Sequence, residues 1–211
     1  MFASVFNSEN PFWQGVARVA DLIWLNILFL VACIPVITGG AAFTALYDTA
    51  WRLFDERGGS VTAMFWRSFR TNFAQATAIW GVVGTAGIGV AAGWLLLPTE
   101  EAFLLKGVLT LVYLLFFPFF FYLQARFTNT VGNTLKNAIL IPLSRLPYAV
   151  GVLLITVVLV ALLFATTFNL PQLLPPLVLV GFGGAAYAVA PLLNYAVQPW
   201  VGEKSGEATS A

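Results

Sequence analysis

The sequence predicts an all-α polytopic membrane protein with five transmembrane helices and two amphipathic cytoplasmic surface helices. The first observation is composition, because 60% of the residues are hydrophobic and only 9% are charged, against about 25% charged in soluble domains. The second is that the apolar residues fall into runs long enough to cross a bilayer, which takes about 20 residues per helix. The third is that amphipathic segments follow the first and third runs. We therefore expect one membrane domain over 1–201 and a disordered polar tail over 202–211.

The ends of the expected spans follow from helix-capping and helix-breaking residues. The first helix is expected to begin near Pro11, because Asn10 is a favourable N-cap and proline fits the first helical turn. Its transmembrane part is expected at 19–37, where Pro35 and two glycines interrupt the helix and allow the backbone to reverse. Pro191 is expected to kink the last span. The later spans are expected at 73–97, 102–123, 147–168 and 173–197.

Two amphipathic segments are expected to lie at the membrane surface rather than to cross the membrane. The first, about 41–57, has apolar side chains at helical spacing on one side and charged residues such as Asp48 and Arg52 elsewhere. The second, about 127–141, carries an asparagine every four residues, which makes a polar stripe on a helix. Residues 61–72 have a similar interfacial composition. The order of span, surface helix and span occurs twice, which indicates a faint internal repeat.

Basic residues in the connections between spans predict the orientation of the chain. Arg18 and Lys106 belong to one side of the membrane, and the other eight basic residues belong to the side with the surface helices and the carboxyl terminus. These eight are Arg52, Arg57, Arg67, Arg70, Arg126, Lys136, Arg145 and Lys204. We therefore expect a multi-pass protein of the bacterial inner, or cytoplasmic, membrane, with the amino terminus outside and the carboxyl terminus in the cytoplasm.

The composition also argues against several classes of function. The chain has no histidine, which removes the usual imidazole base and the common histidine-containing metal sites. Cys33 is the single cysteine, and we interpret it as a small apolar residue. The sequence has no paired intramembrane aspartates, no phosphate-binding glycine loop and no serine with a base, so we expect no catalysis, no cofactor and no metal. A net charge of +1 gives no argument for nucleic-acid binding.

Two polar residues of the first span are candidate site residues. Asp21 is the one carboxylate expected within a span, where a charge costs roughly 2.5 to 3.5 kcal/mol at the bilayer centre. It is either a proton or substrate site or the partner of Arg18, which lies three residues earlier on nearly the same helix face. Asn26 lies deeper and needs a hydrogen-bond partner, which is provided by another helix or by a polar binding site.

Five more hydrogen-bonding side chains are expected at the cytoplasmic ends of the first three spans. They are Thr38, Asn72, Gln75, Arg126 and Asn129. Such a group is able to form a polar vestibule for a sugar, because amides together with aromatic rings bind sugars. The same side chains are also able to satisfy the backbone at the chain reversal that follows Pro35.

Small residues recur every four positions along the second expected span, at Gly81, Thr85, Gly89 and Gly93. A stripe of this kind allows a second helix to approach closely. We interpret it as a helix-packing seam, with a substrate-lining stripe as the alternative.

Two blocks of sequence resemble a known family. The first block comprises Asn26, Pro35, Thr38, Gly40, Ala42, Ala45-Leu46-Tyr47, Phe65, Phe69, Asn72-Phe73 and Gln75-Ala76. The second comprises Phe120-Phe121-Tyr122-Leu123, Ala125-Arg126-Phe127, Asn129-Thr130 and Leu135-Lys136-Asn137-Ala138. In combination they resemble the YesL-like family of small bacterial integral membrane proteins, which is a domain of unknown function whose members accompany carbohydrate uptake systems.

The resemblance implies a function in the membrane near carbohydrate transport. We expect a component of oligosaccharide uptake, either a small transporter or an accessory subunit of a sugar permease. The alternative is a non-transporting scaffold or regulator that uses its cytoplasmic amphipathic helices. The expected partners are the lipid bilayer, a sugar ligand, and either further copies of the chain in a homo-oligomer or subunits of a carbohydrate transporter.

Overall fold

The structure, a computed structural model, describes residues 11–57, 59–96 and 100–207, which are helical over most of their length. The helices of this part of the chain are α1 (Pro11–Cys33), α2 (Gly39–Phe54), α3 (Val61–Leu96), α4 (Phe103–Arg126), α5 (Val131–Ser144), α6 (Leu146–Phe168) and α7 (Leu174–Glu207). Helix α1 begins at Pro11 and ends just before Pro35, as the capping and breaking residues predict. Helix α7 continues to Glu207, into the stretch whose composition predicts a disordered tail; 208–211 lie outside the described residues.

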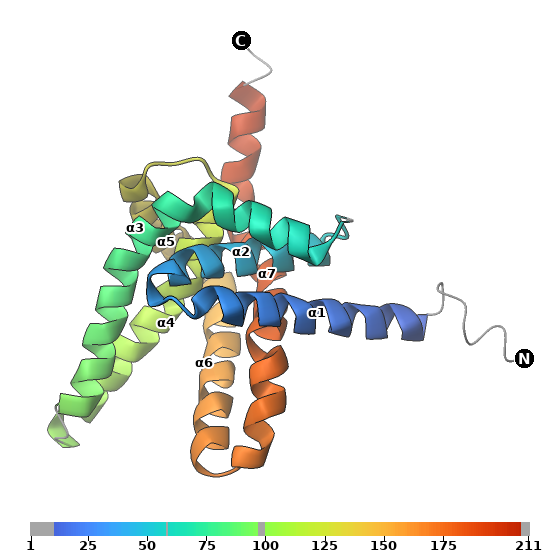
Figure 1. Ribbon diagram of the computed structural model, residues 1–211. Helices are drawn as coiled ribbons and strands as arrows, with labels where there is room; N and C mark the ends of the chain where they lie inside the picture. Colours follow the sequence, from blue (N-terminus) through green and yellow to red (C-terminus); the bar gives the residue numbers. More distant parts are fainter. Residues whose placement is uncertain (1–10, 58, 97–99, 208–211) are drawn as a thin grey trace, which may run out of the picture.

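Two antiparallel hairpins and a layer of crossing helices make up the fold (Figure 1). The second part of α3 pairs with α4, and α6 pairs with α7, and the turns of both hairpins point the same way. Helices α1 and α2 run across the hairpins, and α3 begins beside α2 before it turns to descend beside α4. Helix α5 lies at the end of the molecule opposite the hairpin turns.

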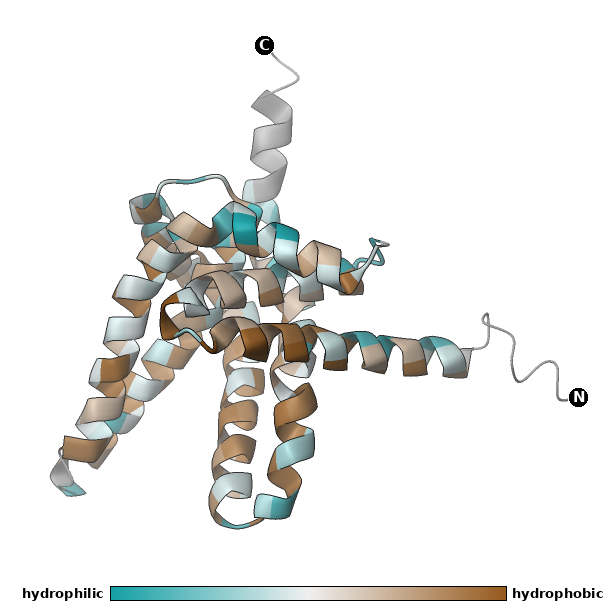
Figure 2. Cartoon of the chain, in the orientation of Figure 1, coloured by the Kyte–Doolittle hydropathy of each residue, from teal (hydrophilic) through white to brown (hydrophobic). Residues whose placement is uncertain are grey.

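Figure 2, which colours the chain by hydropathy, shows mostly hydrophobic residues along the α6–α7 hairpin and a group of hydrophilic residues in the first part of α3. Five helices of the described chain are long and apolar enough to cross a membrane. These candidates are Phe12–Cys33, Val61–Leu96, Phe103–Arg126, Leu146–Phe168 and Pro171–Trp200. The structure therefore confirms an all-α, polytopic membrane protein.

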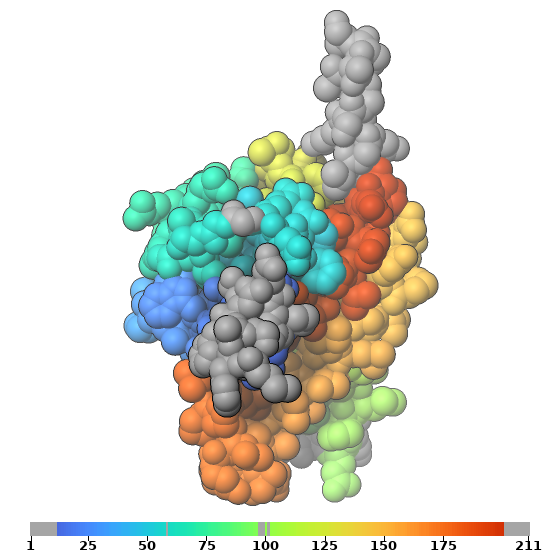
Figure 3. Space-filling view, turned by 90° about the vertical axis from the view of Figure 1, so that its right-hand side faces the viewer, coloured from blue at the N-terminus to red at the C-terminus, as the bar shows by residue number. Residues whose placement is uncertain are grey.

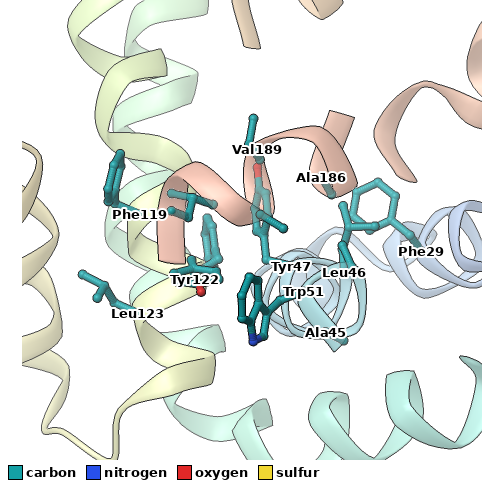
Figure 4. Packing of buried hydrophobic residues seen from close by; sticks show 14 of the residues in the cluster. Phe29, Ala45, Leu46, Tyr47, Trp51, Phe119, Tyr122, Leu123, Ala186 and Val189 are labelled. Atoms are coloured by element: carbon teal, nitrogen blue, oxygen red, sulfur yellow. The ribbon is translucent and has the colours of Figure 1, made fainter. Parts of the chain in front are cut away.

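Helix α2 lies in the centre of the protein, which corrects the expectation that it is a surface helix with an exposed polar face. Figure 4 shows Leu46, Tyr47 and Trp51 of α2 packed among residues of α1, α4 and α7. Even Asp48, on the side expected to be polar and exposed, is only 4% exposed. Burial also raises the pKa of Tyr47, whose phenol therefore stays neutral. The helix is amphipathic, as its residue spacing predicts, and Asp48 and Arg52 on its polar side line a cavity of the protein.

Residues 61–72 and the second expected span form one continuous helix of 36 residues, α3. At 1.5 Å per residue its contour length is about 54 Å, of which only the part that descends beside α4 is available to cross the roughly 30 Å of a bilayer core. Its first part packs beside α2, and Val61, Met64 and Phe65 are buried there. No glycine or proline lies between 61 and 80, so the helix stays continuous, but it bends between the part beside α2 and the part that descends beside α4 (Figure 1).

Close packing of α2 on α3 depends on the glycines after the chain reversal. A Cβ atom on Gly40 would lie 2.2 Å from the carbonyl oxygen of Ala76 and 2.6 Å from Cβ of Trp80. The indole nitrogen of Trp80 donates a hydrogen bond to the carbonyl oxygen of Val36 (2.8 Å), which holds the reversal against α3. Gly39 and Gly40 form the first residues of α2, and Gly39 has helical backbone angles, so the structure assigns these glycines to close helix contact.

The start of α1 lies against the connection between α2 and α3. The guanidinium of Arg18 donates a hydrogen bond to the carbonyl oxygen of Leu53 and forms an ion pair with Glu56, with 3.4 Å between Nη2 and Oε1. The expected topology places Arg18 outside the cell and Glu56 in the cytoplasm. The structure brings the two residues into contact, so they lie at the same level of the protein.

The small-residue stripe of α3 does not pack against another helix within the described chain. A Cβ atom at Gly81, Gly89 or Gly93 would meet nothing within 4 Å. The close approach of α4 instead uses Gly87, where a Cβ atom would lie 2.5 Å from the hydroxyl oxygen of Tyr113. The predicted packing seam is therefore wrong for contacts inside one copy, because α4 meets a different face of α3.

Candidate binding cavity

A polar cavity of about 730 Å³ lies between α2, α3, the end of α4 and the connection from α4 to α5. Its size is in the range of small-molecule sites, which run from roughly 300 to 1,000 Å³. It lies at the end of the molecule opposite the hairpin turns. Its lining comprises Asp48, Arg52, Arg67, Ser68, Thr71, Asn72, Gln75, Gln124, Ala125, Arg126, Phe127, Thr128, Asn129 and Thr130. We call it the amide cavity, after its three joined amide side chains.

The three joined amides connect α4 to α3. Gln124 donates from Nε2 to Oε1 of Gln75 (2.8 Å) and to Oδ1 of Asn72 (3.4 Å). Asn72 in turn donates to the carbonyl oxygen of Ser68, one helical turn earlier (2.9 Å). Gln124 is 3% exposed, and its Oε1 has no hydrogen-bond partner among the described residues. An unsatisfied buried acceptor costs roughly 1–3 kcal/mol, so this oxygen is well suited to accept from a ligand hydroxyl.

Charged side chains lie beside the amides. Asp48 and Arg52 form an ion pair one turn apart on α2, with 3.1 Å between Oδ2 and Nε. Arg126 donates to Oδ1 of Asn194 on α7 (3.1 Å), and its guanidinium carbon lies 5.3 Å from the centre of the Trp51 ring. These contacts fix the position of Arg126 at the wall of the amide cavity. The arrangement offers hydrogen-bond donors and acceptors to a polar ligand.

Four of the candidate residues from the sequence line the amide cavity together. They are Asn72, Gln75, Arg126 and Asn129. Asn72 and Gln75 lie on α3, about fifty residues before Arg126 at the end of α4 and Asn129 in the loop that follows. The packing of α4 on α3 brings the two pairs together. The structure thus brings together four of the five polar side chains that were expected at the ends of these spans, and Thr38 lies apart from them.

Asn26 and Thr38 lie elsewhere and bond to the backbone. Asn26 is fully buried, accepts from the N–H of Gly183 (2.8 Å) and donates to the carbonyl oxygen of Val178 (2.6 Å). The hydroxyl of Thr38 lies within hydrogen-bond distance of the carbonyl oxygens of Ala32 and Pro35, and the Pro35 carbonyl also accepts from the backbone N–H of Thr38. Neither residue lines the amide cavity. The bonds of Asn26 fit the alternative of an interhelical hydrogen bond, and those of Thr38 fit the alternative of a side chain that satisfies the chain reversal.

Asp21 lines a second, smaller cavity of about 330 Å³ beside Arg52 and Arg57. The expected ion pair with Arg18 does not form, because Arg18 instead pairs with Glu56 on the connection after α2. Asp21 is half-buried and shares this cavity with basic side chains. It does not line the amide cavity.

The sequence reasoning missed several residues of the amide cavity, among them Asp48, Arg52, Arg67 and Gln124. The first two carry a signal, since an acid and a base four residues apart mark one helix face, but that face was expected to meet water. Gln124 also carried a signal as the first amide after a long aromatic run. Among the residues that the structure describes, no three His, Cys, Asp or Glu side chains gather in a manner suited to a metal ion.

Comparison with known proteins gives a family for part of the chain. Residues 22–94 match the family model described as "Protein of unknown function, DUF624", which is the YesL-like family. The resemblance to the YesL-like family is thereby confirmed. The matched segment includes α2 and the α3 side of the amide cavity. No curated protein and no solved structure matches the chain.

Proposed function

We propose that this protein is a membrane component of carbohydrate uptake, acting as a small transporter or as an accessory subunit of a sugar permease. The observation that carries the proposal is the amide cavity, in which three joined amides meet arginines and hydroxyls. The YesL-like resemblance adds that such proteins accompany carbohydrate uptake systems. The proposed role is binding or transport and involves no catalysis.

The chemistry of the cavity suits a ligand with many hydroxyl groups. Each sugar hydroxyl donates one hydrogen bond and accepts others, and an amide side chain offers both functions. Gln124 Oε1 is an acceptor without a partner among the described groups, and Asn129 adds a half-buried amide from the loop after α4. A neutral apolar ligand would leave these groups unpaired, which is costly.

We further propose that the amide cavity faces the cytoplasm of a bacterial cell. Arg52, Arg67 and Arg126 line it, and Arg70, Lys136 and Arg145 lie on the helices and connections at the same end. Basic residues are concentrated on the cytoplasmic side of membrane proteins. The carboxyl terminus follows on this side, because the α6–α7 hairpin returns the chain to the end that holds α5.

Replacing Asn129 by Ala is expected to lower uptake of labelled oligosaccharide at least threefold without changing the amount of folded protein. The amide lies at the cavity wall in a loop, so its loss removes ligand contacts but no helix packing. Uptake is measured in cells that lack the gene and carry either variant. Asn133→Ala is the control, since Asn133 is exposed on α5 and does not line the cavity. Equal uptake in both variants and in cells without the gene, for every sugar tried, would remove the proposed function.

The second candidate function is a non-transporting scaffold or regulator, and α5 is the feature that favours it. Asn133, Lys136 and Leu140 are exposed on this helix at the cavity end. Helix α2 no longer supports this function, because it is buried. For both candidate functions we propose further copies of the chain or transporter subunits as the partners. If Lys136→Ala loses a co-purifying subunit while oligosaccharide uptake is unchanged, the result would favour the scaffold.

A further inference from the structure

We propose that the ligand of the amide cavity is an anionic polyol, which carries a negative charge beside its hydroxyl groups. This inference rests on the proposed binding site and adds the charge of its ligand. Three arginines line the cavity, at positions 52, 67 and 126, against one carboxylate, Asp48. The carboxylate is already paired with Arg52, so two positive charges have no acidic partner in the lining.

Arg67 and Arg126 differ in how they would act on an anion. Arg126 is held in place by Asn194 and by the ring of Trp51, so its guanidinium is ordered before a ligand arrives. Arg67 is exposed on the first part of α3, and no ion pair involves it among the described residues. A guanidinium binds a carboxylate or phosphate through two parallel hydrogen bonds. Oε1 of Gln124 has no hydrogen-bond partner among the described residues and is an acceptor only. It therefore suits a ligand hydroxyl, which donates, and not the anionic group.

Two sources supply this chemistry, and they are separable. A sugar acid brings a carboxylate from the cytoplasm, whereas an anionic lipid such as phosphatidylglycerol brings a phosphate and a glycerol from the membrane. Both present an anion beside hydroxyl groups, and both match the lining.

The test is equilibrium binding to the purified full chain in nanodiscs of phosphatidylcholine, which has no net charge. Glucuronate and glucose are the matched probes, because they differ only in the carboxylate. Glucuronate is expected to bind at least tenfold more tightly than glucose, which corresponds to about 1.4 kcal/mol. Arg67→Gln is expected to abolish this preference, and Arg70→Gln, an exposed arginine of the same helix outside the cavity lining, is expected to retain it.

Each outcome decides the proposal. Equal binding of glucose and glucuronate overturns the anionic ligand and leaves sugar binding intact. The third probe is phosphatidylglycerol added to the nanodisc. If it is the only probe that binds, and Arg67→Gln abolishes its binding, then the anionic polyol is a lipid and the proposed uptake function is wrong. Binding of none of the three probes overturns both.

A separate observation concerns how α1 meets the membrane. Helix α1 has the length and hydropathy of a span, yet Figure 1 shows it crossing the α6–α7 hairpin rather than running along it. Its residue Arg18 contacts Leu53 and Glu56, at the connection between α2 and α3. Figure 3 shows this connection (cyan) far from the turn of the α6–α7 hairpin (lower orange). If α1 crossed the bilayer before α2, its first residues would lie on the side of the membrane opposite to the α2–α3 connection. Arg18 could then not contact Glu56.

We infer that α1 lies along the cytoplasmic leaflet and that the chain crosses the bilayer four times, through α3, α4, α6 and α7. The exposed face of α1 would contact acyl chains, since Val19 and Val31 are each 52% exposed and Trp24 is 47% exposed. Its polar residues Gln14 and Asp21 line the cavity beside Arg52 instead. This placement puts nine of the ten basic residues on one side and leaves Lys106 on the other, a stronger bias than the five-span topology gives.

Single cysteines in a Cys33→Ala background test this placement with a membrane-impermeant maleimide on spheroplasts. Gly15→Cys reports on α1, Gly132→Cys on α5, and Gln172→Cys on the α6–α7 turn; all three positions are exposed, and both glycines have open space around them. We expect only position 172 to react before permeabilisation, and positions 15 and 132 to react afterwards. Reaction of 15 together with 172 would overturn the four-span topology. If positions 15 and 132 react before permeabilisation and position 172 does not, the result would support four spans but with the opposite orientation in the membrane.

Discussion

Gly40→Ala is expected to destabilise the protein strongly, although the substitution adds only one methyl group. The added Cβ atom would lie 2.2 Å from the carbonyl oxygen of Ala76 and 2.9 Å from the carbonyl carbon of the same residue. Both atoms belong to the α3 backbone, which cannot rotate away as a side chain can. Overpacking of a core costs about 1–3 kcal/mol, and a clash with backbone belongs at or beyond the upper end of that range. We expect a loss of about 3 kcal/mol, measured as a lower thermal-unfolding midpoint of the detergent-solubilised protein.

Gly132→Ala is the matched control for this substitution. Gly132 is exposed in the first turn of α5, and nothing lies within 4 Å of the position of its Cβ. Alanine is the better helix former by about 1 kcal/mol, so this variant is expected to be unchanged or slightly more stable. Equal unfolding midpoints for the two variants would show that α2 and α3 do not pack as closely as the structure has them.

Asn26→Ala is expected to loosen α1 from α7. The substitution removes a donor and an acceptor that join these helices, and it leaves the N–H of Gly183 and the carbonyl oxygen of Val178 without the side chain that contacts them. Gly183 marks close contact, since a Cβ atom there would lie 2.7 Å from the carbonyl oxygen of Leu22. The substitution removes two buried hydrogen bonds, which contribute roughly 0.5–1.5 kcal/mol each, so we expect a loss of about 2 kcal/mol.

The same unfolding experiment measures this effect. Asn133→Ala makes the identical chemical change at an exposed amide of α5 and is expected to change the unfolding free energy by less than about 0.5 kcal/mol. Glucuronate binding separates a structural role from a binding role: Asn26→Ala is expected to retain the affinity of the folded fraction, because Asn26 does not line the amide cavity. A normal unfolding midpoint combined with lost binding would reverse this assignment.

The sequence predicts most of the local structure of this protein. Pro11 marks the start of α1, and Pro35 with the following glycines marks the reversal before α2. These signals depend on the chemistry of a few neighbouring residues, so they can be read without knowledge of the fold. Four cavity residues, including Asn72 and Arg126, were also predicted, because polar groups at the ends of apolar runs must gather where water or other polar groups can satisfy them.

Hydropathy and helix breaking are properties of short segments, so the class of protein and the approximate limits of its helices follow from the order of the residues. The positions of α1 and α2 depend on contacts between distant parts of the chain, which short segments do not encode. An amphipathic pattern shows that a helix has a polar side, but water and a polar protein cavity satisfy Asp48 and Arg52 equally well. In the same way, an apolar helix such as α1 suits either a path across the lipid or a path along it, and we infer the path along it from the contact of Arg18 with Glu56.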